Sequence, residues 1–429
     1  MTSSKLAIHG GPKAVSAKPV PVSPLDPSEL KAALGELIDA GEFSDASGAG
    51  AIGRFERSFA EYIGCDHGLG FCNGTSALLA AYLACGVGPG DEVIHPCYSW
   101  VASVAPLLLL GARPVFCGVS PLSLLIDPAA IGPLITPRTR AISVVHMHGA
   151  VCEMDAVLEI ARARGLPVIE DGSHCHGASY RGRRCGSLGD VGCFSMQGGP
   201  VGGKPVACGE GGIAVCRSRD LYERMTSFAQ INRVPGGGFL DAELAQLAPF
   251  NSGMKFRAHP WAMACASLML RDLDRANAEK REVRARVQES IEPLWALTMC
   301  ETAADSTPGG FYGGINLLHH PERAGGVPAA RILDALKAEG VACGPAPYPL
   351  LHRLPLFRGD APGARRLYPW LAETPAPAAS TDLGPSEDAH GRVVNVLFPM
   401  QLSPGDPYVP QMLDAFRKVY GHLSRGEFI

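Results

Sequence analysis

Lysine is scarce in this chain of 429 residues. Of the 38 basic side chains, nine are lysines and 29 are arginines. Between Lys31 and Lys280 the only lysines are Lys204 and Lys255. A reaction that uses an amine as its nucleophile therefore has very few candidate side chains over the greater part of the chain.

An excess of charge of one sign is also lacking, as are long hydrophobic runs. The formal net charge of −4 and the pI of about 6.4 give no electrostatic footprint for nucleic acid or an anionic membrane. The longest apolar run, residues 101–110, is far shorter than the roughly 20 residues of a membrane span. The first residues have no apolar region typical of a signal peptide. We therefore expect a soluble protein that binds neither nucleic acid nor membrane and acts on a small polar substrate.

Disulfide frameworks and metal-binding motifs are missing as well. The 14 cysteines include no C-x-x-C pair and are too sparse for a disulfide scaffold, so we expect reduced thiols in the cytoplasm. The pairs His146/His148 and His174/His176 each offer two ligands on one face, whereas structural zinc needs four. The sequence therefore predicts no metal site.

What is present is an alternation of strand-like apolar runs and amphipathic helical patterns. With 46% hydrophobic and 19% charged residues, the composition is typical of a well-buried globular protein. The alternation predicts an α/β fold, in which helices cover both faces of a mostly parallel sheet. The expected strands are residues 92–96, 113–118, 141–148, 166–171 and 212–217, and the expected helices include residues 77–85 and 153–165.

A smaller C-terminal domain is expected to follow the sheet. A long charged helix, predicted at residues 261–295, connects the two parts. We expect a large domain at residues 27–270 and a small domain at residues 271–429, with residues 1–26 packing on the small one. Its expected elements are helices at residues 329–338 and 409–422, a strand at 393–398, and an irregular segment rich in Pro, Ala and Gly at 358–391.

The residues that carry chemistry gather in one stretch. Asp171 ends a buried strand, Ser195 and Gln197 follow about 25 residues later, and Lys204 precedes a glycine-rich turn. An acid for a ring nitrogen, polar groups for a phosphate and an amine for a Schiff base would together hold pyridoxal phosphate. Each residue alone has a plainer interpretation: Asp171 as a helix cap, Lys204 as a solvated surface charge.

Several motifs in a fixed order resemble a known family. They are NGTSAL from Asn73, GVGPGDEVIHPCYSWVAS from Gly86, EDGSHCHGASYRGRRCGSLGD from Glu170, then FSMQ, CGEGG, GMKFRAHP and PGDPYV. This order resembles the DegT/DnrJ/EryC1/StrS sugar aminotransferases, which are fold-type-I pyridoxal-phosphate enzymes. The resemblance covers nearly the whole chain and implies the same fold and cofactor.

The resemblance also implies roles for individual residues. Lys204 would form the Schiff base and move the proton, and Asp171 would keep the pyridine nitrogen protonated. Trp100 would stack on the ring, and His174 would lie near the phenolic oxygen. The cofactor phosphate would be held by the start of a helix and by two side chains: Gly74, Thr75, Ser76, Ser195 and Gln197.

A cross-subunit site is a further implication. The segment around Lys255 resembles a loop that reaches into the neighbouring subunit, where Lys255 would contact the partner's cofactor phosphate. We therefore expect a homodimer whose active sites are completed across the interface.

One departure from the family concerns the lysine itself. In relatives the Schiff-base lysine follows the Gln of the FS-x-Q motif by three residues, whereas Gln197 and Lys204 are seven apart. Four residues are therefore extra, and the intervening segment GGPVGG is flexible enough to bulge outward and preserve both ends. The segment could equally reshape the pocket around the amine.

The function implied is transfer of an amino group from Glu or Gln to a keto sugar or keto cyclitol in antibiotic biosynthesis. His174 and the RAHP segment favour a cyclitol or a free sugar, and His146 and Arg257 are candidate substrate contacts. A nucleotide sugar would need a basic cleft, for which Arg233, Arg257 and Arg353 are available. Two alternatives stay open: dehydration, cyclisation or aromatisation on the same cofactor, or an inactive relative. Dehydratases of this fold carry histidine in place of the lysine, so Lys204 argues against that reaction.

Overall fold

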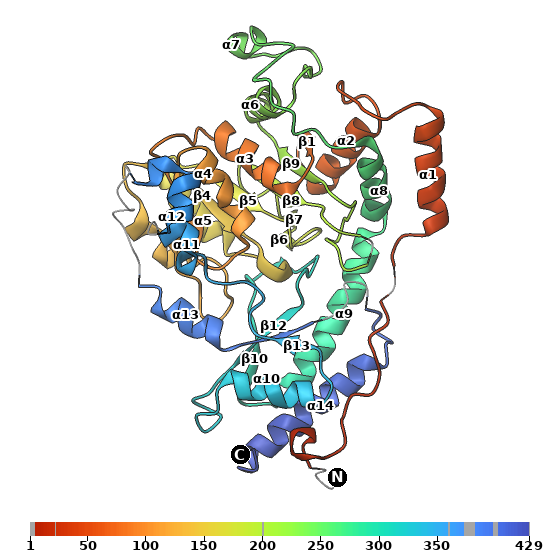
Figure 1. The fold of residues 1–429 in the computed structure, drawn as a ribbon, viewed down its shortest axis with the longest axis vertical. Helices are drawn as coiled ribbons and strands as arrows, with labels where there is room; N and C mark the ends of the chain where they lie inside the picture. Colours follow the sequence, from red (N-terminus) through yellow and green to blue (C-terminus); the bar gives the residue numbers. More distant parts are fainter. Residues whose placement is uncertain are drawn as a thin grey trace.

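A seven-stranded sheet lies at the centre of the larger part of the molecule (Figure 1). The computed structural model describes residues 5–21, 23–199, 201–358, 361–372, 382–397 and 402–428. Neighbouring strands from β8 to β3 are parallel, whereas β9 runs antiparallel to both of its neighbours. The predicted mostly parallel α/β sheet is therefore confirmed. Its spatial order is β1 (His67–Phe71), β9 (Gly212–Cys216), β8 (Val191–Ser195), β5 (Val168–Asp171), β4 (Thr139–Val145), β2 (Glu92–Pro96) and β3 (Arg113–Cys117).

Both faces of this sheet are covered by helices because its central strands are apolar on both sides. In β5, Val168 packs into the core on one face and Ile169 into the core on the other. A strand buried on both faces reads as a continuous apolar run, which is why the sequence pattern located most of them. The covering helices are α2 (Ala51–Ile63), α3 (Gly74–Ala84), α4 (Ala105–Leu109), α5 (Met154–Arg164), α6 (Arg219–Ala229) and α8 (Pro260–Arg271).

Two elements differ from their predicted bounds: one strand ends earlier than its pattern predicts, and one helix begins earlier. The strand expected at residues 141–148 stops at Val145, because the chain turns at His146 and His148 takes a left-handed conformation (φ 54°). The helix expected at 77–85 starts at Gly74, where the Asn73 side chain accepts a hydrogen bond from the Ser76 amide at 2.8 Å. Asn before a helix is a common start signal, and here it places the first helical residue three positions earlier than the apolar pattern predicts.

The smaller part of the molecule is built on a four-stranded antiparallel sheet. Its order is β10 (Leu297–Met299), β12 (Ile315–His319), β14 (Val393–Val396) and β13 (Cys343–Gly344). Three helices pack against it: α9 (Leu273–Ile291), α10 (Ala329–Ala338) and α14 (Tyr408–Ser424).

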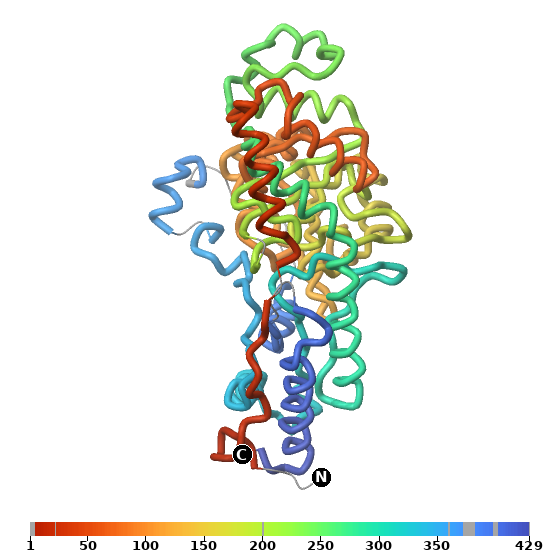
Figure 2. Tube along the Cα trace, turned by 90° about the vertical axis from the view of Figure 1, so that its right-hand side faces the viewer, coloured from red at the N-terminus to blue at the C-terminus, as the bar shows by residue number. Residues whose placement is uncertain are grey.

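The N-terminal segment runs along this smaller part, and both chain ends lie at the same end of the molecule (Figure 2). Leu6 and Val15 are buried in the core of the smaller part. The amides of Ala7 and Ala14 donate to the Glu339 carboxylate at 2.8 and 2.9 Å. These contacts fix the segment against α10.

The helix predicted at residues 261–295 is two helices. The chain leaves helical geometry at Asp272 (φ −99°, ψ 4°), between α8 and α9, and α9 ends at Ile291. A charge-rich helical pattern does not reveal a one-residue break of this kind. The domain boundary predicted at 270–271 falls beside this junction, and the division into two domains there stays a prediction.

The segment predicted as irregular contains short helices where it is described. They are α12 (Pro362–Leu367) and α13 (Gly384–Gly391), preceded by α11 (Pro355–Arg358); residues 359–360 and 373–381 lie outside the described residues. The remaining α-helices and strands are α1 (Pro27–Asp39), α7 (Ala242–Ala245) and a small sheet of β11 (Ser306–Thr307), β6 (Ser179–Tyr180) and β7 (Arg183–Arg184).

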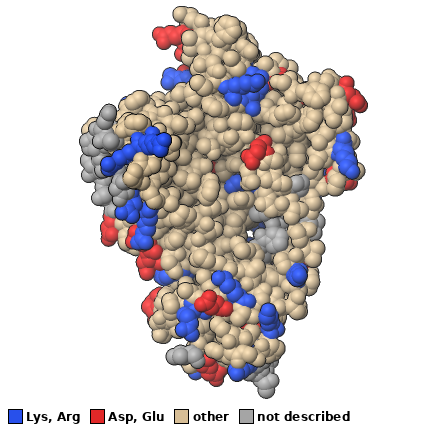
Figure 3. Space-filling view, viewed as in Figure 1, with Lys and Arg blue, Asp and Glu red and all other residues tan. Residues whose placement is uncertain are grey.

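The surface carries charges of both signs in small groups. On the face shown in Figure 3, Lys and Arg side chains and Asp and Glu side chains lie in small scattered groups on a surface made mostly of other residues. Among the described residues, no helix is both long enough and apolar enough to cross a bilayer.

Candidate active site

A cavity of about 400 Å³ opens at the carboxyl ends of the parallel strands, where ligands bind in open α/β sheets. Its walls come from the start of α3, the loops after β2, β4 and β5, the end of β8 and the segment before β12. Eight of the residues proposed from the sequence line it together: Gly74, Thr75, Trp100, Asp171, His174, Ser195, Gln197 and Lys204.

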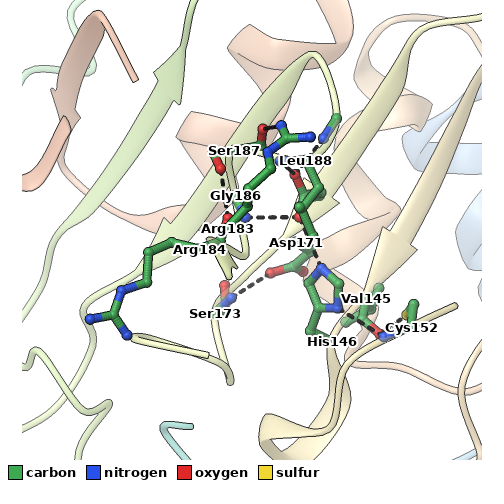
Figure 4. A network of polar contacts seen from close by, with 12 residues as sticks. Val145, His146, Cys152, Asp171, Ser173, Arg183, Arg184, Gly186, Ser187 and Leu188 are labelled. Carbon is green, nitrogen blue, oxygen red and sulfur yellow. Dashed lines mark hydrogen bonds and ion pairs between the residues drawn. The ribbon is translucent and has the colours of Figure 1, made fainter. Parts of the chain in front are cut away.

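Asp171 is the last residue of β5 and only 4% exposed. One carboxylate oxygen accepts a hydrogen bond from the Ser103 hydroxyl at 2.7 Å. The other accepts from the Ser173 amide at 3.0 Å, which Figure 4 shows as a dashed line. These two bonds fix the orientation of the carboxylate at the wall of the cavity.

Lys204 is 8% exposed, and its amine lies 3.6 Å from the centroid of the Tyr312 ring. Burial lowers the pKa of this amine to about 7, although the charge of Asp171 opposes the shift. At neutral pH a large share of the amine is therefore unprotonated, which is the form that attacks a carbonyl.

This lowered pKa gives a prediction for the protein freed of cofactor. The rate of covalent attachment of added pyridoxal phosphate should rise with pH through about 7 and level off above about pH 8, because the unprotonated amine is the reactive form. Absorbance or mass measurements between about pH 5.5 and 9 would follow it. A rate that still rises tenfold per pH unit at the upper end would show an ordinary lysine.

The loop before Lys204 closes at its base. The Lys204 amide donates to the Gln197 carbonyl at 2.9 Å, and Gly198 and Gly209 exchange two hydrogen bonds of 2.8 Å. The ends of the extra segment therefore lie side by side, while Gly199, Val201 and Gly202 are exposed; Pro200 lies outside the described residues. Of the two outcomes left open by the sequence, the structure has the outward bulge.

The start of α3 is pressed against the end of β8. A Cβ added at Gly74 would lie 2.7 Å from the Cβ of Ser195, so only glycine fits. The first amides of a helix have no intrahelical acceptor and favour an anion. Together with the hydroxyls of Thr75 and Ser195 they offer donors for a phosphate group. Ser76 does not line the cavity, and its amide already donates to Asn73.

His146 lies away from the cavity, contrary to its predicted role as a substrate contact. Its ring is fully buried; Nε2 donates to Glu170 at 3.0 Å, and Nδ1 accepts from the Cys152 amide at 3.2 Å (Figure 4). The Glu170 carboxylate also accepts from three amides, those of Gly186, Leu188 and Gly189. The ring therefore belongs to a buried network behind the site.

The arginines considered for a basic cleft are engaged elsewhere. Arg257 donates to the carbonyl of Ile231 at 2.6 Å and does not line the cavity. Arg233 forms a buried ion pair with Glu56, and Arg353 pairs with Glu387. Lys255 also lies outside the cavity of its own chain. Within the described residues, Lys204 is the one Lys or Arg that lines the cavity.

His174 is kept neutral. Burial, with the Lys204 charge nearby, lowers the pKa of His174 well below its usual value. Its Nδ1 accepts from the His148 amide at 3.4 Å, which leaves Nε2 to carry the proton. A neutral donor of this kind suits a contact with an anionic oxygen.

The sequence missed two aromatic residues of the cavity, Tyr312 and Tyr348. Both come from the smaller part of the molecule, more than 100 residues beyond Lys204, and only the tertiary fold brings them near it. The glycine pairs around Tyr312 were the one local signal, because they indicate close backbone approach.

One cluster of possible metal ligands exists among the described residues. It consists of His146, Cys175 and Cys185, whose ligand atoms lie within 4.8 Å of one another. Both ring nitrogens of His146 already form hydrogen bonds, so the cluster offers fewer than the four ligands of a structural zinc site.

A buried lysine at the carboxyl edge of a mostly parallel sheet, beside a strand-end aspartate and a helix N-terminus, defines a fold-type-I pyridoxal-phosphate enzyme. The model of the DegT/DnrJ/EryC1/StrS aminotransferase family matches residues 26–382, and the chain belongs to this family. The resemblance seen in the sequence is thereby confirmed, and with it the fold, pyridoxal phosphate as cofactor and aminotransferase activity.

Individual relatives cover almost the whole chain. The L-glutamine:2-deoxy-scyllo-inosose aminotransferase of Streptomyces lividus is 34% identical over 435 residues, 98% of each chain. The L-glutamine:scyllo-inosose aminotransferase of Streptomyces griseus is 34% identical over 431 residues, again 98% of each. Among solved structures, S. venezuelae DesV in complex with a ketimine intermediate is 26% identical with a TM-score of 0.74, covering 92% of this chain and 94% of that one. 3-Amino-5-hydroxybenzoic acid (AHBA) synthase shares the fold at 23% identity, with a TM-score of 0.77 and coverage of 96% and 100%.

Proposed function

We propose that this enzyme transfers the amino group of glutamine to the ketone of an uncharged cyclitol in antibiotic biosynthesis. The observation that carries the choice of substrate class is the part of the cavity lining that this chain itself contributes, in which Lys204 is the one Lys or Arg among the described residues. A nucleotide sugar brings a diphosphate, which is normally met by arginine or lysine. Glutamine as donor and an inosose as acceptor are what the names of the two Streptomyces relatives state.

Pyridoxal phosphate, when bound, supplies the electron sink that stabilises a carbanion at the amino-bearing carbon. We propose that Lys204 holds the cofactor through its amine and then carries the proton that moves during transfer. Asp171 holds a proton on the ring nitrogen. Both roles agree with the low pKa of Lys204 and the fixed carboxylate of Asp171.

The other cavity residues hold and orient the cofactor in this proposal. His174 donates to the phenolic oxygen, and Trp100, half-exposed at the cavity wall, stacks on the ring. The phosphate is held at the start of α3 and the end of β8, by Gly74, Thr75, Ser195 and Gln197.

A donor and acceptor scan tests the function. The enzyme loaded with cofactor is mixed with single amino acids, and the aminated cofactor is followed by its absorbance; glutamine should react fastest. The aminated enzyme is then given scyllo-inosose or a nucleotide-linked keto sugar, and only scyllo-inosose should restore the original spectrum. No reaction with any amino acid would overturn transamination. Preference for the nucleotide sugar would overturn the substrate class.

We further propose a homodimer in which Lys255 contacts the cofactor phosphate of the partner. Lys255 is exposed and lies outside its own cavity. Large apolar side chains on the neighbouring chain segment are exposed by 44–75%, as expected of a surface that a partner covers: Val234, Leu240, Leu247, Phe250 and Met254.

Replacing Lys255 by alanine should weaken cofactor retention about tenfold while leaving covalent attachment to Lys204 intact, because one charged contact to the phosphate is lost. Dialysis against buffer followed by cofactor titration measures this. Lys337→Ala, an exposed lysine on α10, is the control and should retain cofactor as the parent does. Equal retention in both variants would contradict the cross-subunit contact.

The cytoplasm is the proposed location. All 14 cysteines are unpaired in the structure, as expected of a protein in a reducing compartment.

A further inference from the structure

We propose that the hydroxyl of Tyr312 binds a hydroxyl group of the acceptor cyclitol, and that His148, held by Tyr98, is a positioning residue that sets where Tyr312 lies. This inference rests on the proposed function, since it names a contact for the same acceptor.

Tyr312 sits over the reacting amine. Its ring centroid lies 3.6 Å from the Lys204 amine and 4.8 Å from the centroid of the His174 ring. It lines the cavity, and its phenol oxygen has no hydrogen-bond partner among the described residues. Asp171 and Ser195 are assigned to the cofactor, so the Tyr312 hydroxyl is a donor and acceptor left for the substrate.

The backbone around Tyr312 is packed too closely to move by itself. A Cβ added at Gly310 would lie 2.5 Å from the carbonyl oxygen of His174, and one at Gly149 would lie 2.3 Å from that of Gly309. Phe311 has a φ of 54°, which is uncommon for a residue with a side chain. The segment that carries Tyr312 is therefore fixed against the loops after β4 and β5.

His148 holds the Tyr312 carbonyl. Nδ1 of His148 lies 3.0 Å from this oxygen, so Nδ1 carries the proton and donates it. Nε2 must then accept, and the Tyr98 hydroxyl lies 3.1 Å away as the donor. Burial lowers the pKa of His148 to about 4, so the ring stays neutral and keeps this tautomer. The chain Tyr98–His148–Tyr312 thus has one consistent direction of donation.

A tyrosine held in place in this way would help to orient a polyol acceptor. An uncharged cyclitol offers only hydroxyl groups, so its ketone can be placed at the amine only by hydrogen bonds and ring contacts. A tyrosine whose ring is fixed over Lys204 in the cavity wall can offer its hydroxyl for such a bond at a constant position.

The test compares three variants in the holoenzyme with scyllo-inosose as acceptor. Tyr312→Phe should raise KM for scyllo-inosose about threefold to tenfold with kcat nearly unchanged, which corresponds to one neutral hydrogen bond. Tyr98→Phe should also raise KM for scyllo-inosose, but by a smaller factor than Tyr312→Phe does. The double variant should show no rise beyond Tyr312→Phe alone, because the position of a missing hydroxyl no longer matters.

Controls distinguish loss of the Tyr312 hydrogen bond from a general structural effect, and also from an error in the proposed function. Each variant must attach pyridoxal phosphate as the parent does, and Tyr62→Phe, which loses a hydroxyl bonded to Asp274 and does not line the cavity, should keep the parent KM. An unchanged KM in Tyr312→Phe, or single effects that multiply in the double variant, would overturn the inference. No turnover of scyllo-inosose by the parent enzyme would instead overturn the proposed function.

Discussion

Replacing Lys204 by alanine is expected to abolish covalent attachment of pyridoxal phosphate and to lower amino transfer by at least about 1,000-fold. Lys204 is the one Lys or Arg among the described residues that line the cavity. The pKa of its amine is about 7, so a large share of the amine is unprotonated and reactive at neutral pH. The substitution removes both the attachment point and the group that moves the proton. Borohydride reduction followed by mass measurement of the intact protein reports attachment directly.

Lys280 provides a matched control for this experiment. It is partly buried, and desolvation lowers the pKa of its amine to about 8, but Lys280 does not line the cavity and its amine donates to the carbonyl of Gly310 at 3.2 Å. Lys280→Ala should still attach the cofactor covalently. Attachment that survives in Lys204→Ala and disappears in Lys280→Ala would show that the wrong lysine was assigned.

Asp171→Asn is expected to slow the half-reaction with glutamine by about 100-fold to 1,000-fold while cofactor attachment continues. Asparagine has nearly the same shape and can still accept from the Ser173 amide, and its amide nitrogen can donate to the Ser103 hydroxyl. What it lacks is the negative charge that keeps a proton on the ring nitrogen. Stopped-flow absorbance of the glutamine half-reaction measures the loss.

Ser103→Ala tests the orientation of the same carboxylate. This variant keeps the charge and removes one hydrogen bond, so the half-reaction should slow by no more than about tenfold. A loss in Ser103→Ala as large as that in Asp171→Asn would assign the effect to geometry. A half-reaction of parent speed in Asp171→Asn would contradict the role of the charge.

The elements predicted well from the sequence are those whose pattern has a local cause. The strand at 92–96 and the helix at 329–338 were predicted with their observed bounds, because a doubly buried strand and an amphipathic helix each have a distinct periodicity. The break at Asp272 was missed because a single non-helical residue hardly disturbs that periodicity.

The same distinction, between features with a local cause and features that depend on the tertiary fold, applies to the residues of the candidate site. Asp171, Ser195, Gln197 and Lys204 lie in one continuous stretch, and they meet in one cavity. His146 was misplaced because the sequence cannot tell which face of the chain turns away after a strand ends. Tyr312 and its support by His148 depend on contacts between segments more than 150 residues apart, which no local pattern contains.

The base of the loop at residues 198–203 has a consequence for how such enzymes are counted in genomes. Backbone pairing between Gly198 and Gly209, and from Lys204 to Gln197, keeps Gln197 and Lys204 together although six residues lie between them. A search pattern that demands a fixed Gln-to-Lys spacing would discard this chain. In this chain the backbone pairing at the base of the loop, and not the number of residues between Gln197 and Lys204, decides that the two residues lie close together.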